Sequence, residues 1–179
     1  MANVVVCVGG SVAAYKACDL VSKLVQAGHR VDVVLTRMAL RFLKPLSFSA
    51  LTQRRAHTDR GWGEGTHPAE HLAVTRDAAL VIVAPCTANL IGRFAHGLAD
   101  EIVSTTVLGA GCPVLLAPAM NVRMWENPRV QANLEVLKAD GVHVVGPEKG
   151  WLAEAEQGMG RMSEPDAILA AARKFLAGK

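Results

Sequence analysis

The sequence predicts a doubly wound α/β fold, in which helices cover both faces of one parallel sheet. Short, continuous apolar runs such as "NVVVCV" and "AALVIVAP" have the length and composition of strands that are buried on both faces. Segments with apolar residues at helical spacing separate these runs. A helix of this length lets the chain cross from one strand to a parallel neighbour, so the pattern indicates βαβ units.

The predicted elements alternate along the chain. The strands are expected over residues 3–8, 30–36, 78–85, 112–118 and 142–147. The helical segments are expected over residues 11–28, 39–52, 88–97, 100–111, 127–141 and 165–178. Ser11 is a suitable N-cap for the first helix, and Gly28 stands just past its end. The second helical segment should break at Pro45 and restart there.

Two segments do not follow this alternation. They are "RGWGEGTHPAEH", residues 60–71, and "EKGWLAEAEQGMGRM", residues 148–162. We expect both to be long irregular loops, which in a compact domain are usually functional or mobile, although each is equally well explained as a solvated connection.

Composition narrows the class of protein. The chain has 179 residues, 51% of them hydrophobic, and shows no repeat or linker, so residues 1–179 are expected to form a single domain. The net charge of +3 is too small and dispersed to favour nucleic-acid binding. No signal peptide or membrane span is expected. The four cysteines lack metal-ligand spacing, which indicates small core residues of a cytoplasmic protein and no metal site.

Three motifs follow predicted strands, at the edge of the sheet where ligands usually bind. In "VGGSVAAYK", Gly9 and Gly10 allow close approach of a ligand, and Ser11 begins a helix whose N-terminus favours an anion such as phosphate. The alternative is an ordinary tight turn. In "APCTANL", Thr87 and Asn89 suit the polar edge of a flavin or a base, or simply a helix cap.

The third motif, "PAMNVRMW", is the most suggestive. It places Asn121 directly after a buried strand, on a turn that Pro118 stiffens. The alternative is that Asn121 caps a helix and its neighbours Met120, Met124 and Trp125 pack in the core. His67 and His71, in or just after the first irregular segment, are additional candidates because histidine exchanges protons near neutral pH.

Taken together, these motifs resemble the homo-oligomeric flavin-containing cysteine decarboxylases. That family includes phosphopantothenoylcysteine decarboxylases and the peptidyl-cysteine decarboxylases of lantibiotic and related peptide pathways. The resemblance covers nearly the whole chain, from "VGGSVAAYK" to "GRMSEP". Its most specific marker is "PAMNVRMW", which matches the family's Pro-x-Met-Asn-x-x-Met-Trp motif. "APCTANL" is similar to the family's Pro-Ala-Ser-Ala-Asn motif, and "HGLADEIVSTT" to its Gly-Leu-Ala-Asp block.

The resemblance implies a flavodoxin-like (Rossmann-like) sheet in a three-layer α/β/α arrangement, with FMN as cofactor and FAD as the alternative. It also implies trimers, which often assemble into dodecamers. The cofactor-binding positions that it implies are Gly9, Gly10, Ser11, Thr36, Phe42, Thr87, Asn89 and Met120. The glycines and Ser11 would hold the flavin phosphate, and Met120 would lie against the isoalloxazine ring.

The resemblance also implies a catalytic pair. The family's catalytic histidine stands at a steady distance before Pro85, which identifies His71, in "HLAV", and makes His67 a bystander. Asn121 would bind the substrate carboxylate. The substrate-binding positions that follow are Asn121, Met124, Trp151, Leu152, Glu154 and Arg161. Trp151 and Leu152 would cover the apolar part of the site, as part of a mobile lid, and Arg161 would pair with an acidic group of the lid or the substrate.

One departure from the family pattern guides the functional prediction. Phosphopantothenoylcysteine decarboxylases carry Leu-Ala-Cys-Gly where this chain reads "LAEA", so Glu154 replaces the family cysteine. In the family mechanism, flavin oxidises the cysteine to a thioaldehyde, which loses CO2 and leaves an ene-thiol. The family cysteine then helps to reduce the ene-thiol. A glutamate is no redox partner for a thiol, so the reaction should stop at the ene-thiol.

Our leading hypothesis is therefore oxidative decarboxylation of the C-terminal cysteine of a precursor peptide to an aminoenethiol. The alternative is a phosphopantothenoylcysteine decarboxylase of coenzyme A biosynthesis that does without the cysteine. A third possibility is a flavin-binding scaffold without turnover, which the presence of both His71 and Asn121 disfavours.

Overall fold

The computed structural model describes residues 1–59 and 70–176, and for residues 70–72 it describes the backbone alone. Among these residues, the main sheet contains β1 (Asn3–Val8), β2 (Arg30–Leu35), β3 (His57–Thr58), β4 (Ala78–Cys86), β5 (Val114–Pro118) and β6 (His143–Val144). All adjacent strands pair in parallel, in the order β3-β2-β1-β4-β5-β6. Without the two-residue β3, this is the flavodoxin-like strand order, so the predicted fold class is confirmed.

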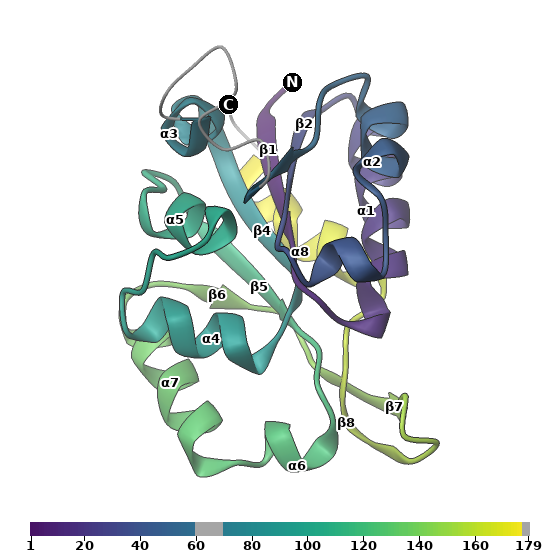
Figure 1. The fold of residues 1–179 in the computed structure, drawn as a ribbon, viewed down its shortest axis with the longest axis vertical. Coiled ribbons are helices and arrows are strands. Elements are labelled where there is room, and N and C mark those ends of the chain that lie inside the picture. The colour runs from purple at the N-terminus through teal and green to yellow at the C-terminus, as the bar shows by residue number, and fades with distance from the viewer. Residues whose placement is uncertain (60–69, 177–179) are drawn as a thin grey trace.

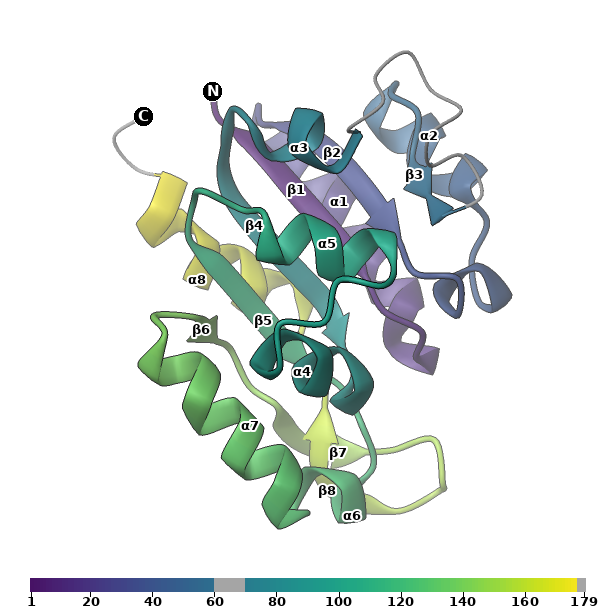
Figure 2. The same cartoon turned by 60° about the vertical axis from the view of Figure 1, so that its left-hand side comes forward.

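Helices cover both faces of this sheet (Figures 1 and 2). One face carries α1 (Tyr15–Gln26), α2 (Pro45–Thr52) and α8 (Pro165–Leu176). The other carries α3 (Glu70–Thr75), α4 (Ala88–Ala95), α5 (Ile102–Leu108) and α7 (Pro128–Ala139). Short helices η1 (Val12–Ala14), η2 (Ala39–Arg41) and α6 (Val122–Trp125) follow β1, β2 and β5.

The central strands are buried on both sides because alternate side chains enter two separate cores. Val4 and Val6 of β1 pack against α1 and α8, whereas Val5 and Cys7 pack against α4, α5 and α7. This arrangement explains why the strands read as continuous apolar runs rather than alternating ones. Cys7 and Cys86 are fully buried, as we expected of small core residues, whereas Cys18 and Cys112 are only partly buried.

Most predicted elements are confirmed to within a few residues. Ser11 caps the η1 turn that leads into α1, and the segment 39–52 divides at Pro45 into η2 and α2. Gly28 has a φ of +83° just past the end of α1. Neither α3 nor β3 was among the predicted elements. Within the described residues, no helix is both long and apolar enough to cross a bilayer.

The prediction of an irregular loop over 148–162 was wrong. This segment forms an antiparallel hairpin of β7 (Glu148–Trp151) and β8 (Gln157–Arg161), which projects beyond the carboxyl edge of the main sheet (Figure 1). The hairpin escaped prediction because its strands are short and their two buried positions, Gly158 and Gly160, are glycines, so the sequence lacks the apolar alternation of a half-buried strand.

Candidate functional site

A large cavity lies at the carboxyl edge of the sheet, where the strand order changes direction between β1 and β4. Its walls come from the segments that follow β1, β2, β4 and β5, together with the β7–β8 hairpin. Ligands of open α/β sheets bind at this switch point. The cavity volume is about 1760 Å³, which exceeds the roughly 300–1,000 Å³ of a typical ligand pocket. It therefore has room for a cofactor and a substrate together.

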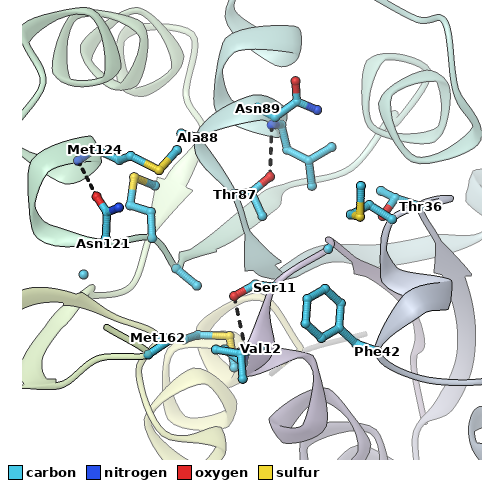
Figure 3. Close-up of a pocket in the computed structure, with 18 of the residues that line it drawn as sticks. Ser11, Val12, Thr36, Phe42, Thr87, Ala88, Asn89, Asn121, Met124 and Met162 are labelled. Carbon is cyan, nitrogen blue, oxygen red and sulfur yellow. Dashed lines mark hydrogen bonds between the residues drawn. The ribbon is translucent and has the colours of Figure 1, made fainter. Parts of the chain in front are cut away.

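The turn after β1 forms the end of the cavity that suits a phosphate. The Ser11 Oγ accepts a hydrogen bond from the Ala13 N–H at 3.3 Å, which fixes the start of the helix (Figure 3). A Cβ on Gly10 would collide with the side chain of Met38, so only glycine leaves this backbone open to a ligand. Gly9 is buried and does not line the cavity; its N–H donates to the Pro85 carbonyl at 3.1 Å.

Three of the predicted polar residues also cap helices or turns. Thr36 Oγ1 accepts from the Ala39 N–H at 3.0 Å, and Thr87 Oγ1 from the Leu90 N–H at 3.4 Å. The Asn121 Oδ1 accepts from the Met124 N–H at 2.8 Å (Figure 3). All three line the cavity, so the cap and the ligand-binding interpretations are compatible. Because the cap uses only Oδ1, the Asn121 side-chain NH2 remains available as a donor to a ligand.

Most of the residues that were predicted to bind the cofactor or the substrate lie around this one cavity. Those that line it are Gly10, Ser11, Thr36, Phe42, Thr87, Asn89, Met120, Asn121, Met124, Trp151, Leu152, Glu154 and Arg161. Exposed donors and acceptors, a glycine cradle and apolar side chains are the set that a flavin needs, with its phosphate, polar ring edge and apolar ring faces. The described residues thus fit this cofactor.

The hairpin is fastened to the "PAMN" turn by its glycines. The Met120 N–H donates to the Gly160 carbonyl at 3.0 Å. Gly160 has a φ of +139°, and a Cβ there would collide with the Met120 carbonyl; a Cβ on Gly158 would collide with Val122. The base of the hairpin therefore lies against the predicted substrate-binding turn, while Trp151, Leu152 and Glu154 extend along the cavity.

An ion-pair chain holds the other side of the hairpin base. The buried Lys16 Nζ donates to the Glu164 carboxylate at 2.8 Å and to the Met162 carbonyl at 3.3 Å. Arg161 pairs with Glu164 at 3.1 Å and with Glu148, across the hairpin, at 3.4 Å. The hydrogen bond from Lys16 lowers the pKa of the Glu164 carboxyl below its ordinary value. Arg161 is thus engaged by acidic groups of the hairpin and of the segment after it.

Several cavity residues were not predicted from the sequence. Arg93 pairs with Asp100, and burial raises the pKa of the Glu101 carboxyl, whose Oε1 accepts from the Ser104 N–H at 2.7 Å. Lys16, Arg37, Met38 and Arg41 also line the cavity. These four residues stand in "VGGSVAAYK" and "LTRMALRF", beside predicted site residues, and this proximity in the sequence could have identified them.

The roles predicted for His71 and His67 are not tested by the structure. His71 falls in helix α3, but its side chain is outside the described part of the structure, and His67 lies outside the described residues altogether. The assignment of the catalytic role to His71 remains a prediction.

Known proteins provide an independent comparison. Coenzyme A biosynthesis bifunctional protein CoaBC of Bacillus subtilis (strain 168) is 46% identical over 175 residues, which cover 98% of this chain and 43% of the relative. The chain thus spans less than half the length of that bifunctional relative. A probable phosphopantothenoylcysteine decarboxylase of Streptococcus mutans is 34% identical, with 93% of this chain and 94% of the relative covered.

Solved structures agree in fold. A cysteine-to-serine mutant of PPC decarboxylase complexed with pantothenoylaminoethenethiol has a TM-score of 0.89 and 31% identity, with 98% of both chains covered. The FMN-dependent cysteine decarboxylase TvaF from thioviridamide biosynthesis has a TM-score of 0.84 and 31% identity, with 99% of both chains covered. The model of the family described as Flavoprotein matches residues 1–177. With a flavin-compatible cavity at the switch point of a flavodoxin-like sheet, this chain belongs to the Flavoprotein family.

Proposed function

We propose that this protein is an FMN-dependent decarboxylase of the cysteine carboxyl group, with phosphopantothenoylcysteine as its substrate. The observation that carries the proposal is the similarity to a probable phosphopantothenoylcysteine decarboxylase over nearly the full length of both chains. The more similar CoaBC relative supports the same choice. Our leading hypothesis from the sequence, a peptide substrate, is less well supported than its alternative.

The residues of this chain would divide the work as follows. Ser11 and the first helical turn would hold the flavin phosphate, and Thr36, Phe42, Thr87, Asn89 and Met120 would surround the rest of the cofactor. The Asn121 NH2 would donate to the substrate carboxylate, and His71 would accept or relay the thiol proton. A bound flavin would accept the two electrons that leave the substrate cysteine.

Peptidyl-cysteine decarboxylation remains a second candidate, because of Glu154. Glu154 lines the cavity where the family cysteine is expected, and none of the described residues that line the cavity is a cysteine. Reduction of an ene-thiol takes a hydride from the reduced flavin and a proton from an acid beside the substrate, and we infer that the Glu154 carboxyl is a poor replacement for the thiol of the family cysteine in this step. We therefore expect an ene-thiol product, with the two electrons passed to an external acceptor such as O2.

Mass spectrometry of the products separates the two substrates. The purified, flavin-loaded protein is mixed with phosphopantothenoylcysteine and, separately, with peptides that end in cysteine. Turnover of phosphopantothenoylcysteine alone supports the proposal, whereas turnover of the peptides alone would replace it with the second candidate. A colourless protein that takes up neither FMN nor FAD would refute both.

The mass of the product tests the role of Glu154. Loss of CO2 and two hydrogens is the expected result, and the Glu154→Cys variant should shift the product toward loss of CO2 alone. If the wild-type protein already forms the saturated thiol, Glu154 does not limit the reaction and the argument for a peptide substrate fails. Glu156→Cys, two residues along the hairpin, is the matched control because Glu156 does not line the cavity.

We also propose a homo-oligomer, a trimer or a dodecamer built from trimers. Large apolar side chains stand exposed around the mouth of the cavity, as a neighbouring chain would need: Val12, Tyr15, Met38, Phe42, Met124 and Trp151. Light scattering measures the mass in solution, and a stable monomer would contradict this proposal.

A further inference from the structure

The positive charges of the cavity differ in whether they are neutralised. Three of the five cationic side chains that line it have acidic partners: Lys16 pairs with Glu164, Arg93 with Asp100, and Arg161 with Glu148 and Glu164. Arg37 and Arg41 have none among the residues that the structure describes, and both are exposed to the cavity. The wall between β2 and α2 therefore presents two uncompensated guanidinium groups.

These two arginines have apolar neighbours that also face the cavity. Met38 and Phe42 line it and are 54% and 48% exposed. Thr36, next to Arg37, fixes the turn by accepting the Ala39 N–H at 3.0 Å. The wall therefore combines an apolar surface with two cations four residues apart on a capped turn. Such a surface suits a ligand whose neutral arm ends in a strongly anionic group.

We propose that Arg37 and Arg41 bind the phosphate monoester of the substrate and so select a phosphorylated substrate over a peptide. This inference rests on the proposed function. Guanidinium groups form strong, charge-assisted hydrogen bonds to phosphate, often two at a time. Phosphopantothenoylcysteine carries two anionic groups, a carboxylate and a phosphate, which correspond to Asn121 and to the arginine pair. A cysteine-ending peptide offers its carboxylate to Asn121 but leaves the arginines without a partner.

The phosphate of the flavin is the other group that the two arginines could bind, but the turn at Ser11 already offers a binding site for it. Ser11 and the first helical turn follow β1, whereas the arginines follow β2, the next strand of the sheet. If the arginines instead served the flavin, their removal would release the cofactor. The experiment therefore measures flavin content and substrate selection separately.

The test compares the double variant Arg37→Gln/Arg41→Gln with the wild-type holoenzyme. The measured quantity is the ratio of kcat/KM for phosphopantothenoylcysteine to kcat/KM for pantothenoylcysteine, which lacks the phosphate. We expect this ratio to fall by about 10- to 100-fold, the usual effect of losing hydrogen bonds to a charged group. Arg37→Lys/Arg41→Lys should retain part of the ratio, because the charge stays but the paired hydrogen bonds are lost. Arg173→Gln, an exposed arginine of α8 outside the cavity, is the control and should keep the full ratio.

A binding measurement keeps the inference testable if turnover of these substrates fails. Calorimetry with phosphopantothenate and with pantothenate reports the contribution of the phosphate without any cysteine. The wild-type holoprotein should bind the phosphorylated compound more tightly by a similar factor, and the double variant should lose this preference. The proposal would be overturned if the double variant still preferred the phosphorylated compound to the same extent, or if it no longer bound FMN. Absence of decarboxylation with a normal phosphate preference would refute the proposed function but support the subsite.

Discussion

Gly160 is the hairpin residue that accepts a hydrogen bond from the predicted substrate-binding turn, so Gly160→Ala tests whether this contact sets the geometry of the site. Its φ of +139° favours glycine, and an alanine Cβ would collide with the Met120 carbonyl. The collision involves backbone, which cannot rotate away as a flexible side chain could. The hairpin base must therefore move, and the hydrogen bond from the Met120 N–H to the Gly160 carbonyl must weaken or break.

The size of the effect follows from the two ways in which the chain can respond. Keeping the glycine conformation costs about 1–3 kcal/mol of backbone strain. Moving the hairpin costs the hydrogen bond, about 0.5–1.5 kcal/mol, together with the close packing of Gly158 on Val122. We expect about 2 kcal/mol, concentrated in the hairpin rather than in the two cores. Since 1.4 kcal/mol corresponds to a factor of ten, local opening should become about 30-fold more frequent.

Hydrogen exchange of the Met120 amide measures this opening directly, because its N–H is the donor of the affected bond. We expect exchange about 30-fold faster in Gly160→Ala, with the strands of the main sheet unchanged and with weaker substrate binding. Gly141→Ala is the matched control: its φ is +86°, but a Cβ there meets nothing within 4 Å. Equal exchange of the Met120 amide in the two variants would refute our account of how the hairpin is held.

The remaining predictions concern the site and its ion pairs. Asn121→Ala and Asn127→Ala each remove a helix cap, so each should lower the free energy of unfolding by about 1 kcal/mol in chemical denaturation. Only Asn121→Ala should abolish turnover. Equal activities of the two variants would show that Asn121 is a cap alone. His71→Ala should lower the rate by about 10²–10⁴-fold with flavin still bound, while His67→Ala should be mild, and the reverse result would disprove our assignment. The pKa of Glu164 is lowered in the folded state, so its contribution to stability is present above the unfolded pKa and lost as the pH falls through the lowered value. Urea unfolding should therefore show Glu164→Gln less stable than wild type near neutral pH, with the gap beginning to narrow below about pH 4; a gap that does not narrow on acidification would contradict the ion pair.

Local signals were sufficient to predict most of the fold. Strands such as "NVVVCV" are continuous apolar runs because both faces of the sheet are covered, and this is visible in six consecutive residues. Ser11, Gly28 and Pro45 mark helix ends through backbone rules that act within one turn. The location of the site could also be predicted from the sequence. Parallel strands end at one edge of the sheet, so the motifs that follow β1, β4 and β5 had to meet there.

Only the tertiary structure decided how distant segments complete the site. The hairpin over 148–161 lies against the turn after β5, where Gly158 leaves room for the Val122 side chain and Gly160 for the Met120 backbone, a fit that no periodicity in the hairpin reveals. Lys16 and Glu164 form an ion pair although they are 148 residues apart.

The charge state of the cavity also depends on the fold. Sequence shows that Arg37, Arg41 and Arg161 are cationic, but it cannot show which of them has an acidic partner. The fold brings Glu148 and Glu164 to Arg161 and leaves the other two facing the cavity without one among the described residues. Residue type and short-range pattern determine the strands, the helix caps and the edge of the sheet at which ligands bind. Which cationic side chains are neutralised, and where two backbones lie in close contact, depends on distances between segments that are set only when the chain folds.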